Sequence, residues 1–392
     1  MRESALAMFG VGVAPGWLER AAAAETSQGK KVLVAIFLRG AADGLNLVAP
    51  YGDRGYALAR PNLALAKEKC LDLDGFFGLH PNLKSLHEMF AEKKLAIVHA
   101  AGSPDTTRSH FDAQDYMESG TPGLKATRDG WMNRALPVDQ KASPLRAVSM
   151  GPALARSLRG PSPAVALNSV RDFAVKDEMA GAEYMARYEA SLDAELKGTG
   201  KDTFAAIRLM ESLRKSAYQA ENGALYPRGK LGASLQQIAQ MIKSDVGLQV
   251  AFADMGGWDT HVNQANLLGN LAREFGEALG AFYQDMGAWM DAVTVVTMSE
   301  FGRTVRENGT RGTDHGHANA MFAFGGYVKG GKVYGDWPGL EREQLYEGRD
   351  LRVTTDFREV LGAAVHSHDA RADLARVFPG YRYEGKLGAV FG

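Results

Sequence analysis

Cysteine is nearly absent from the sequence, and neither sign of charge is in excess. Cys70 is the single cysteine among 392 residues, which excludes an intramolecular disulfide framework and a zinc site built from cysteines. Lys and Arg together number 45 against 46 Asp and Glu, for a net charge of −1. Proteins that bind nucleic acid need a basic excess to displace counterions. Nucleic acid is therefore not expected as a partner.

A long hydrophobic run is also missing. Residues 5–18 are apolar, but this stretch is shorter than the roughly 20 residues that a membrane-spanning helix needs. The small residues Ala21–Ala24 follow it, and an apolar stretch that ends in small residues is typical of an export signal. We therefore expect residues 1–27 to be an export signal with its beginning trimmed, because only Arg2 supplies the usual basic start. The mature chain would then be periplasmic or secreted, without a membrane span. A plain amphipathic helix is the alternative.

Short apolar runs alternate with helical patterns along the rest of the chain. The runs, which read as buried strands, are Lys31–Leu38, Leu95–His99, Leu145–Met150, Gly247–Ala253, Ala292–Met298 and Ala320–Phe324. The helical patterns are Leu83–Lys93, Ala182–Lys197, Thr203–Glu221, Leu231–Lys243, Val262–Met290 and Phe357–Val365. This alternation predicts a three-layer αβα sandwich with a mostly parallel central sheet. We expect one domain over residues 28–392, with a helical insertion around residues 176–229.

Polar segments rich in histidine follow the predicted strands. In open α/β sheets, ligands bind beyond the carboxyl ends of the strands, so these segments would converge on one edge. Five of the nine histidines lie in or beside them, namely His99, His110, His261, His315 and His317. The others, expected to be structural, are His80, His87, His366 and His368. The clustering predicts a functional site.

Two of these segments combine carboxylates with imidazoles. They are Asp259-x-His261 and Asp314-His315-x-His317, and this ligand set suits zinc or manganese better than calcium. The alternative is that Asp259 caps a helix that begins near His261.

Three further segments carry polar residues with two possible roles each. Ser109 and Asp112 have the spacing of a capping box that opens a helix through Met117. Ser109, with Arg108 beside it, is then either an ordinary cap or a nucleophile that lies where a helix dipole favours an anion. The remaining candidates are Asp43, as a metal ligand or a turn residue, and Glu300 with Arg303, as metal ligand and oxyanion clamp or as an ion pair.

The motifs, in this order, resemble a family of bacterial proteins that share a domain of unknown function, DUF1501. That family belongs to the alkaline phosphatase and sulfatase-like superfamily, and many of its members carry twin-arginine export signals. The motifs are FLRGAADGLNLVAPY (Phe37–Tyr51), TRSHFDAQDYMESG (Thr107–Gly120), GGWDTH (Gly256–His261), SEFGRT (Ser299–Thr304), GTDHGHANAMFAFGG (Gly312–Gly326), GGKVYGDWPGL (Gly330–Leu340) and TTDFREVL (Thr354–Leu361).

The resemblance implies an alkaline phosphatase-like fold whose active members hold two metals at the strand ends. By position, Asp43 corresponds to the carboxylate of the first strand and Ser109 to the nucleophile. The pair Asp259 and His261 resembles an Asp-His pair of the superfamily. Glu300 and Phe301 lie where a second Asp-His pair is expected, so a phenylalanine replaces a histidine and one metal, or none, becomes an alternative to two. The last histidine of the pattern falls near Asp314, His315 and His317.

The leading hypothesis is an exported, metal-dependent hydrolase of phosphate or sulfate esters. Its cofactor would be a divalent metal (zinc, manganese or calcium), and its substrate a small anionic ester or a sulfated or phosphorylated glycan. Ser109 would attack, and Arg108 or Arg303 would neutralise the ester oxygens. If Ser109 is only a cap, water would attack with His110 as the base. The alternatives are a non-catalytic binding or assembly protein on a degenerate hydrolase fold, and a metal-independent esterase.

These hypotheses share one expectation about geometry. The residues expected to converge are Asp43, Ser109, Asp259, His261, Glu300 and His315. We expect His315 to be the most important ligand.

Overall fold

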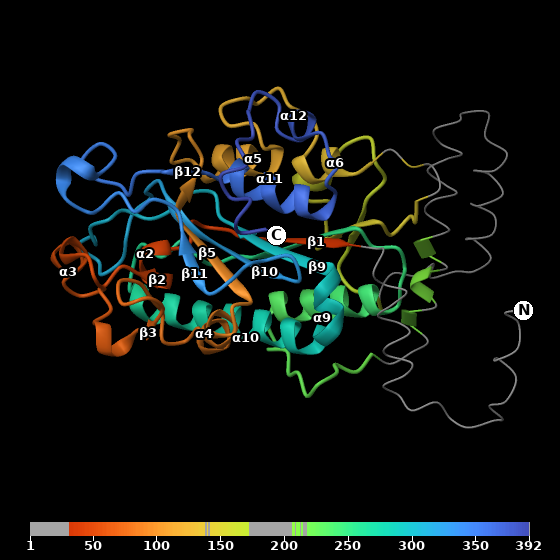
Figure 1. The fold of residues 1–392 in the computed structure, drawn as a ribbon, viewed down its shortest axis with the longest axis horizontal. Helices are drawn as coiled ribbons and strands as arrows, with labels where there is room; N and C mark the ends of the chain where they lie inside the picture. Colours follow the sequence, from red (N-terminus) through yellow and green to blue (C-terminus); the bar gives the residue numbers. More distant parts are fainter. Residues whose placement is uncertain are drawn as a thin grey trace, which may run out of the picture.

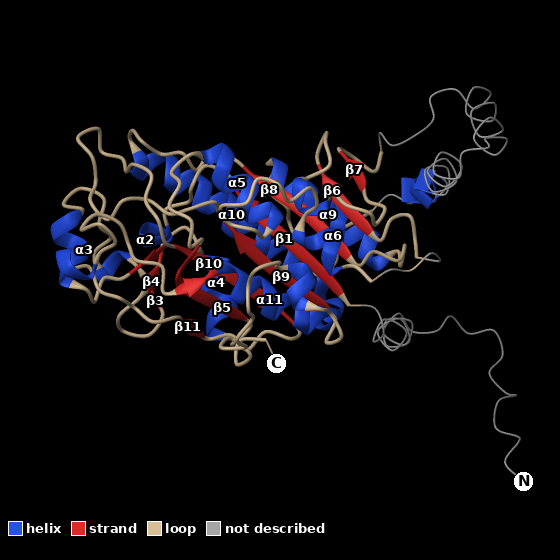
Figure 2. Cartoon of the chain, turned by 90° about the horizontal axis from the view of Figure 1, so that it is seen from above, coloured by secondary structure: helices blue, strands red, loops and turns tan. Residues whose placement is uncertain are grey.

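A single mixed sheet forms the centre of the molecule (Figures 1 and 2). The structure is a computed structural model, and it describes residues 31–391 except 138, 140, 141, 172–205, 208, 212 and 215–217. In this part of the chain, the nine-stranded sheet has the order β11-β5-β10-β9-β1-β8-β6-β7, with β12 paired to β5. The strands are β1 (Val32–Leu38), β5 (Leu95–Gly102), β6 (Ala147–Met150), β7 (Val165–Leu167), β8 (Val250–Met255), β9 (Val293–Met298), β10 (Asn319–Gly325), β11 (Lys332–Tyr334) and β12 (Thr355–Asp356).

Helices cover both faces of this sheet (Figure 1). One face carries α4 (Lys84–Ala91), α9 (Lys230–Lys243) and α10 (Gln264–Met286). The other carries α5 (His110–Ser119), α6 (Trp131–Ala135), α11 (Phe357–His368) and α12 (Leu374–Val377). The predicted three-layer sandwich is therefore confirmed.

Smaller elements gather at one end of the molecule (Figure 1). They are α2 (Gly44–Leu47), α3 (Arg54–Ala59) and a three-stranded antiparallel sheet of β2 (Val48–Ala49), β4 (Gly78–Leu79) and β3 (Leu71–Asp72). Short 3-10 helices occupy Lys67–Lys69, Arg156–Leu158, Gly287–Ala292 and Arg342–Gln344.

Strand β1 shows why the sequence forms this sheet. All seven of its residues are buried. Successive side chains of a strand point to opposite faces, so Val34 and Ile36 join the core under α9 and α10. Ala35 and Phe37 join the core under α6 and α11. A continuous apolar run is what a strand covered on both faces requires.

The predicted strands each overlap a strand of the structure, but β10 runs in the unexpected direction. Strand β1 is parallel to both β8 and β9, whereas β10 is antiparallel to β9 and β5. The beginning of β10 therefore lies at the same edge as the carboxyl ends of β1, β8 and β9. This direction brings the loop that precedes β10, with its histidines, to that edge.

Three of the sequence predictions concern segments that lie wholly or mostly outside the described residues. The export signal predicted for residues 1–27 and the helix predicted for residues 182–197 lie outside the described residues. The same is true of most of the insertion predicted around residues 176–229. Within the described part of the chain, no helix combines the length and apolar character that crossing a bilayer demands.

A fully buried ion pair fastens the end of β1 to the loop after β9. Asp43 and Arg60 are both inaccessible to solvent, and Arg60 Nη1 donates to Asp43 Oδ2 over 2.6 Å. Gln264 donates to the same carboxylate oxygen. The remaining nitrogens of Arg60 donate to the backbone carbonyls of Thr304 (2.8 Å) and Val305 (2.9 Å). Asp43 thus neutralises a guanidinium that is committed to holding two loops together.

This pair leads to a prediction about stability. Asp43→Ala leaves the Arg60 charge buried without its counterion, and breaking a buried pair in this way costs about 3–5 kcal/mol. The free energy of unfolding, measured by denaturant titration, should fall by that amount. Arg371→Ala, which breaks the solvent-exposed pair with Asp369, is the control and should cause no measurable loss. Equal stability of the two variants would show that the buried pair does not hold the loops.

Candidate metal centre

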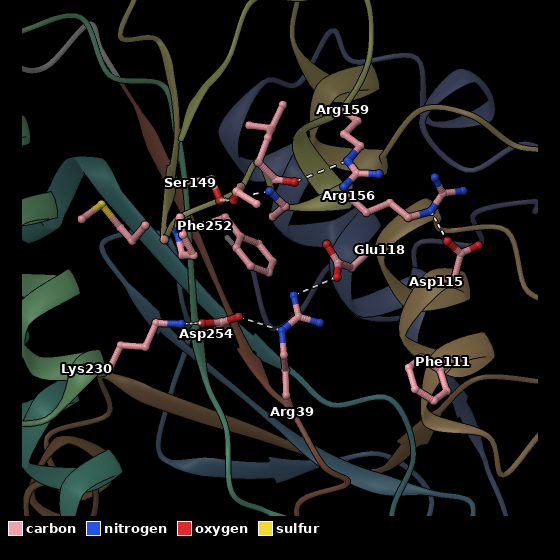
Figure 3. Close-up of a pocket in the computed structure, with 16 residues that line it drawn as sticks. Arg39, Phe111, Asp115, Glu118, Ser149, Arg156, Arg159, Lys230, Phe252 and Asp254 are labelled. Carbon is pink, nitrogen blue, oxygen red and sulfur yellow. Dashed lines mark hydrogen bonds and ion pairs between the residues drawn. The ribbon is translucent and has the colours of Figure 1, made fainter. Parts of the chain in front are cut away.

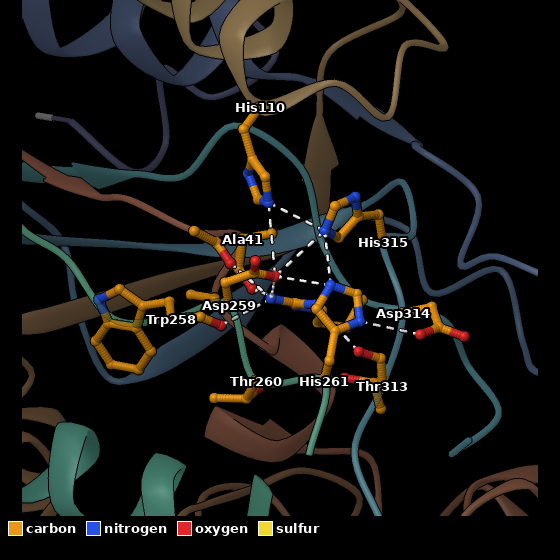
Figure 4. A network of polar contacts seen from close by, with 12 residues as sticks. Ala41, His110, Trp258, Asp259, Thr260, His261, Thr313, Asp314 and His315 are labelled. Atoms are coloured by element: carbon orange, nitrogen blue, oxygen red, sulfur yellow. Dashed lines mark hydrogen bonds and ion pairs between the residues drawn. The ribbon is translucent and has the colours of Figure 1, made fainter. Parts of the chain in front are cut away.

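Three imidazoles and one carboxylate meet beyond the edge of the sheet (Figure 4). His110 begins α5, Asp259 and His261 lie in the loop after β8, and His315 lies in the loop before β10. The Nε2 atom of His315 lies 3.0 Å from Nε2 of His110 and 2.9 Å from Nε2 of His261. Asp259 Oδ1 lies 3.0 Å, 3.2 Å and 3.5 Å from the Nε2 atoms of His261, His315 and His110. We call these four side chains the histidine cluster.

The Nδ1 atom of each imidazole bonds to an oxygen outside the cluster. The bonds are His110 to Glu300 Oε1 (2.8 Å), His261 to Asp314 Oδ1 (3.0 Å) and His315 to the backbone carbonyl of Arg108 (2.9 Å). Carboxylate and carbonyl oxygens accept hydrogen bonds, so each Nδ1 is the donor. A neutral imidazole protonated at Nδ1 has a lone pair at Nε2. The three rings therefore direct their lone pairs toward one another.

This arrangement fits a divalent metal ion. Three lone pairs and a carboxylate oxygen at these separations repel unless a proton or a metal cation lies among them. Zinc binds imidazole nitrogen at about 2.0–2.1 Å, which places two nitrogens on one ion roughly 3 Å apart. Histidine ligands commonly donate their other nitrogen to a carboxylate or carbonyl, as these do. The donor set suits zinc or manganese, whereas calcium takes six to eight oxygen ligands.

The cluster is open to solvent on one side. Among the described residues, His110, Asp259 and His315 place ligand atoms within 4.8 Å of one another. The imidazoles are half-buried, and Asp259 has 46% of its side chain exposed. A small anion can therefore approach a metal held there.

Arg303 holds the loops that carry the cluster. Its side chain is fully buried, and its Nη2 donates to Asp259 Oδ1 over 2.5 Å. The other acceptors are the backbone carbonyls of Gly40 (2.7 Å), Ala41 (2.8 Å), Trp258 (2.9 Å) and Thr313 (3.0 Å). One guanidinium thus ties together the segments that follow β1 and β8 and the one that precedes β10. Its side chain is therefore committed to holding these segments together, and whether it also contacts a substrate oxygen stays a prediction.

Glycines allow these segments to approach closely. A Cβ on Gly312 would lie 2.1 Å from the carbonyl oxygen of His261, and one on Gly316 would lie 2.3 Å from the carbonyl carbon of Arg303. Any side chain at either position would push backbone apart. The glycines that flank His315 in the sequence are therefore required by packing.

Glu300 is a buried carboxylate that lies behind His110. Its Oε1 accepts hydrogen bonds from the backbone N–H of Gly40 and from Gln114 Nε2, each over 2.8 Å, in addition to the bond from His110. Gln114 was not identified from the sequence. It lies one helical turn after His110 on α5, a spacing that places two side chains on the same face of a helix.

The electrostatic environment favours an ionised Asp259 and a neutral His315, which are the charge states that a metal requires, whereas it favours the protonated form of His110. Burial acts to raise the pKa of Asp259, but the hydrogen bond and charge of Arg303 outweigh it and hold this pKa below its ordinary value. Burial lowers the pKa of His315, so this ring is neutral near pH 7. The hydrogen bond to Glu300 raises the pKa of His110, which reflects the negative charge behind that ring.

Phe301 occupies the space beneath two of the rings. It is buried, and its ring centroid lies 5.0 Å from that of His110 and 5.1 Å from that of His315. The position at which the resemblance leads one to expect a histidine is thus filled by an apolar ring that supports the cluster.

The structure brings some of the predicted site residues together and places others elsewhere. Asp259, His261 and His315 lie in the cluster with His110, which the sequence analysis took as a base. Glu300 and Asp314 do not face the centre of the cluster. They bind the Nδ1 atoms of His110 and His261, on the outer side of these rings. Asp43 is committed to Arg60. His317 Nε2 bonds to the carbonyl of Ser103 over 2.9 Å, and its ring packs on Tyr346.

Ser109 and Arg108 lie beside the cluster in the chain. Ser109 is the N-cap of α5, and its hydroxyl accepts a hydrogen bond from the N–H of Asp112 over 3.5 Å. Arg108 Nη2 donates to Glu347 and Asp350, each over 2.8 Å. The alternative reading of Asp259 as a helix cap does not fit the structure, because α10 begins at Gln264 with Asn263 as its N-cap.

Comparison with solved structures gives similarities of low identity. The chain is similar to PsFucS1 sulfatase from Pseudoalteromonas sp. (13% identity, TM-score 0.37, covering 90% of this chain and 72% of that one). It is similar to the C-terminal periplasmic domain of EcEptC from Escherichia coli, solved in complex with zinc (9% identity, TM-score 0.35, covering 76% of this chain and 74% of that one). It is also similar to alkaline phosphatase from the Antarctic bacterium TAB5 (11% identity, TM-score 0.31, covering 76% of this chain and 92% of that one). No curated protein matches the sequence significantly.

A family model supplies the assignment. The model described as protein of unknown function DUF1501 matches residues 30–369. This range contains the four side chains of the histidine cluster, as well as Glu300, Arg303 and Asp314. The chain therefore belongs to the DUF1501 family, as its motifs predicted.

Proposed function

We propose that the protein is a metal-dependent hydrolase of phosphate or sulfate esters, with its metal held by the histidine cluster. The observation that carries this proposal is the convergence of three Nε2 atoms whose rings are each fixed through Nδ1. A cluster that only stabilised the fold would have no need to face lone pairs at one another. Zinc fits the donor set best, and manganese is the second choice.

The cluster and its surroundings supply two parts of such a reaction. A divalent ion held there supplies a Lewis acid that stabilises negative charge on the ester oxygens. Arg303 keeps Asp259 ionised and oriented toward the three imidazoles. Glu300 and Asp314 place negative charge behind His110 and His261, which strengthens these rings as electron-pair donors.

Ser109 is the proposed nucleophile. It directly precedes His110 at the N-terminus of α5, where backbone N–H groups and the helix dipole favour an anion. Its hydroxyl accepts a hydrogen bond from the N–H of Asp112, and its own proton would pass to the oxygen of the departing alcohol. In the proposed reaction, Ser109 Oγ attacks phosphorus or sulfur and the alcohol departs with a proton. Water then cleaves the serine ester.

The geometry disfavours His110 as a general base. Both of its ring nitrogens are already committed, Nδ1 to Glu300 and Nε2 to the cluster. The metal-independent esterase also receives no support, because no histidine contacts the Ser109 hydroxyl among the described residues. With Phe301 in place of a histidine, we propose one metal rather than two.

The proposed substrate is a phosphate or sulfate ester of a small organic group or of a glycan. The proposed location of the protein is outside the cytoplasm. Support for the location comes from residues 1–27, whose pattern is typical of an export signal.

The main prediction concerns His315, which contacts every other member of the cluster. Purified wild-type protein should contain about one equivalent of zinc or manganese, and should hydrolyse an aryl phosphate or aryl sulfate. His315→Ala should remain folded and lose both metal and turnover. His317→Ala is the matched control, because its ring bonds to a backbone carbonyl, and it should keep the metal. Metal analysis by mass spectrometry checks both variants. Retention of the metal in His315→Ala would refute the proposed site.

A second prediction separates the ligands from the groups that orient them. Glu300→Gln keeps the shape of the side chain and removes its charge from behind His110. Loss of such a partner typically weakens metal affinity about 10–100-fold. A competition titration with a chelator measures this affinity. Unchanged affinity would mean that Glu300 only stabilises the fold.

A third prediction tests the location. The mature protein isolated from its native host should begin near Glu25. Mass spectrometry of the N-terminus, with fractionation of periplasm and cytoplasm, provides the measurement. Folded cytoplasmic protein that retains Met1 would contradict the export proposal.

A further inference from the structure

A second concave site is lined by charged side chains and by Phe111 (Figure 3). It is a pocket of about 430 Å³ at the carboxyl ends of β1, β6 and β8. Arg39 and Asp254 lie on its floor, and the loop from Ser149 to Arg159 forms one wall. Its volume falls in the range of sites for small molecules, and this edge of the sheet is where ligands of α/β proteins bind.

Hydrogen bonds connect the pocket to the cluster. Arg39 Nη1 donates to Gln114 Oε1 over 2.9 Å, and Gln114 Nε2 donates to Glu300 Oε1 over 2.8 Å. Glu300 in turn accepts from His110. The amide of Gln114 thus connects Arg39, which lines the pocket, to Glu300, which binds the proposed metal ligand His110. The side chains of Gln114, Glu300 and His110 therefore lie in series between the pocket and the proposed metal.

Phe111 lines this pocket with its ring open to solvent. It is the residue after His110 on α5, and 89% of its surface is exposed. Because consecutive helical residues point in different directions, His110 faces the cluster while Phe111 faces the pocket (Figures 3 and 4). Covering the exposed apolar surface of Phe111 with a ligand would be favourable, by about 25 cal/mol for each Å² removed from water. Its position marks a surface where an apolar face of a ligand would lie.

The polar groups of the pocket alternate in charge. Asp254 lies between Lys230 and Arg39, and Arg39 lies between Asp254 and Glu118. Both oxygens of Asp254 and Oε1 of Glu118 each keep a second lone pair, and the ammonium group of Lys230 keeps further donors. A surface that offers donors and acceptors side by side matches groups that both donate and accept, which is the property of neighbouring hydroxyls.

We propose that this pocket binds a sugar unit of the ester substrate, with the apolar face of the sugar ring stacked on Phe111. The proposal rests on the proposed function for the position of the ester, since the sugar would carry its phosphate or sulfate group toward the histidine cluster. Its hydroxyls would bond to Asp254, Glu118 and Lys230. Arg159, which has no ion-pair partner among the described residues, lines the same pocket and would bind a further anionic group on the glycan.

A binding experiment tests the pocket separately from catalysis. The purified protein is applied to a printed array of neutral, sulfated and phosphorylated glycans, and the glycans that bind are measured by titration calorimetry. Wild-type protein should bind a subset of sulfated or phosphorylated glycans. Phe111→Ala should raise the dissociation constant at least tenfold, and Phe111→Trp should leave it unchanged. Leu58→Ala removes a comparably exposed apolar side chain from α3 and is the matched control.

The outcomes distinguish this proposal from the proposed function. His315→Ala should still bind the glycan, because the pocket does not include the metal. No binding across the array, or equal binding by Phe111→Ala, would overturn the sugar site even if metal-dependent ester hydrolysis is found. Glycan binding that depends on Phe111, in a protein that contains no metal and hydrolyses no ester, would support the pocket and refute the hydrolase.

Discussion

The buried guanidinium of Arg303 is the interaction on which the candidate site depends. A charge removed from solvent is costly unless its donors are satisfied, and Arg303 meets this demand with four backbone carbonyls and the carboxylate of Asp259. Those carbonyls belong to segments that are far apart in sequence. The planar fork of an arginine can bond to all of them at once, whereas a lysine could not. The positions of His261 and His315 therefore follow from a requirement for hydrogen bonding at a single buried residue.

The same arrangement accounts for the charge of the cluster. Asp259 has its negative charge partly neutralised by Arg303, while Glu300 and Asp314 place further negative charge behind His110 and His261. A cation at the centre would then face one carboxylate, Asp259, and would have the other two behind its imidazole ligands. The buried ring of Phe301 packs against His110 and His315 and lowers the local dielectric there, which strengthens such interactions. An apolar residue at this position supplies no ligand for a second ion, which supports the proposed single-metal site.

Much of this could be predicted from the sequence, and the remainder could not for identifiable reasons. Continuous apolar runs such as residues 32–38 specify buried strands, and polar segments after such strands converge by geometry alone. The sequence therefore led to Asp259, His261 and His315. It could not show that Glu300 binds the outer nitrogen of His110 instead of facing the centre of the cluster. A carboxylate at that position of the sequence could serve either as a metal ligand or as the group that orients a ligand. It could not pair Asp43 with Arg60, because no local pattern links a strand end to a residue beyond the next helix. Arg39 and Phe111 lay inside recognised motifs, yet without the third dimension nothing related them to a pocket.

Gln114 gives the two neighbouring sites a physical connection. Its amide donates to Glu300 and accepts from Arg39, so its orientation is fixed by both partners. A ligand that displaced Arg39 from this bond would leave the amide free to turn, and Glu300 would lose one of the donors that hold its charge beside His110. Occupancy of the pocket would then alter the electron-donating strength of a cluster ligand. Coupling of this kind must be reciprocal, so an ion at the cluster would oppose a ligand that displaced Arg39 and would not oppose one that left the bond between Arg39 and Gln114 in place.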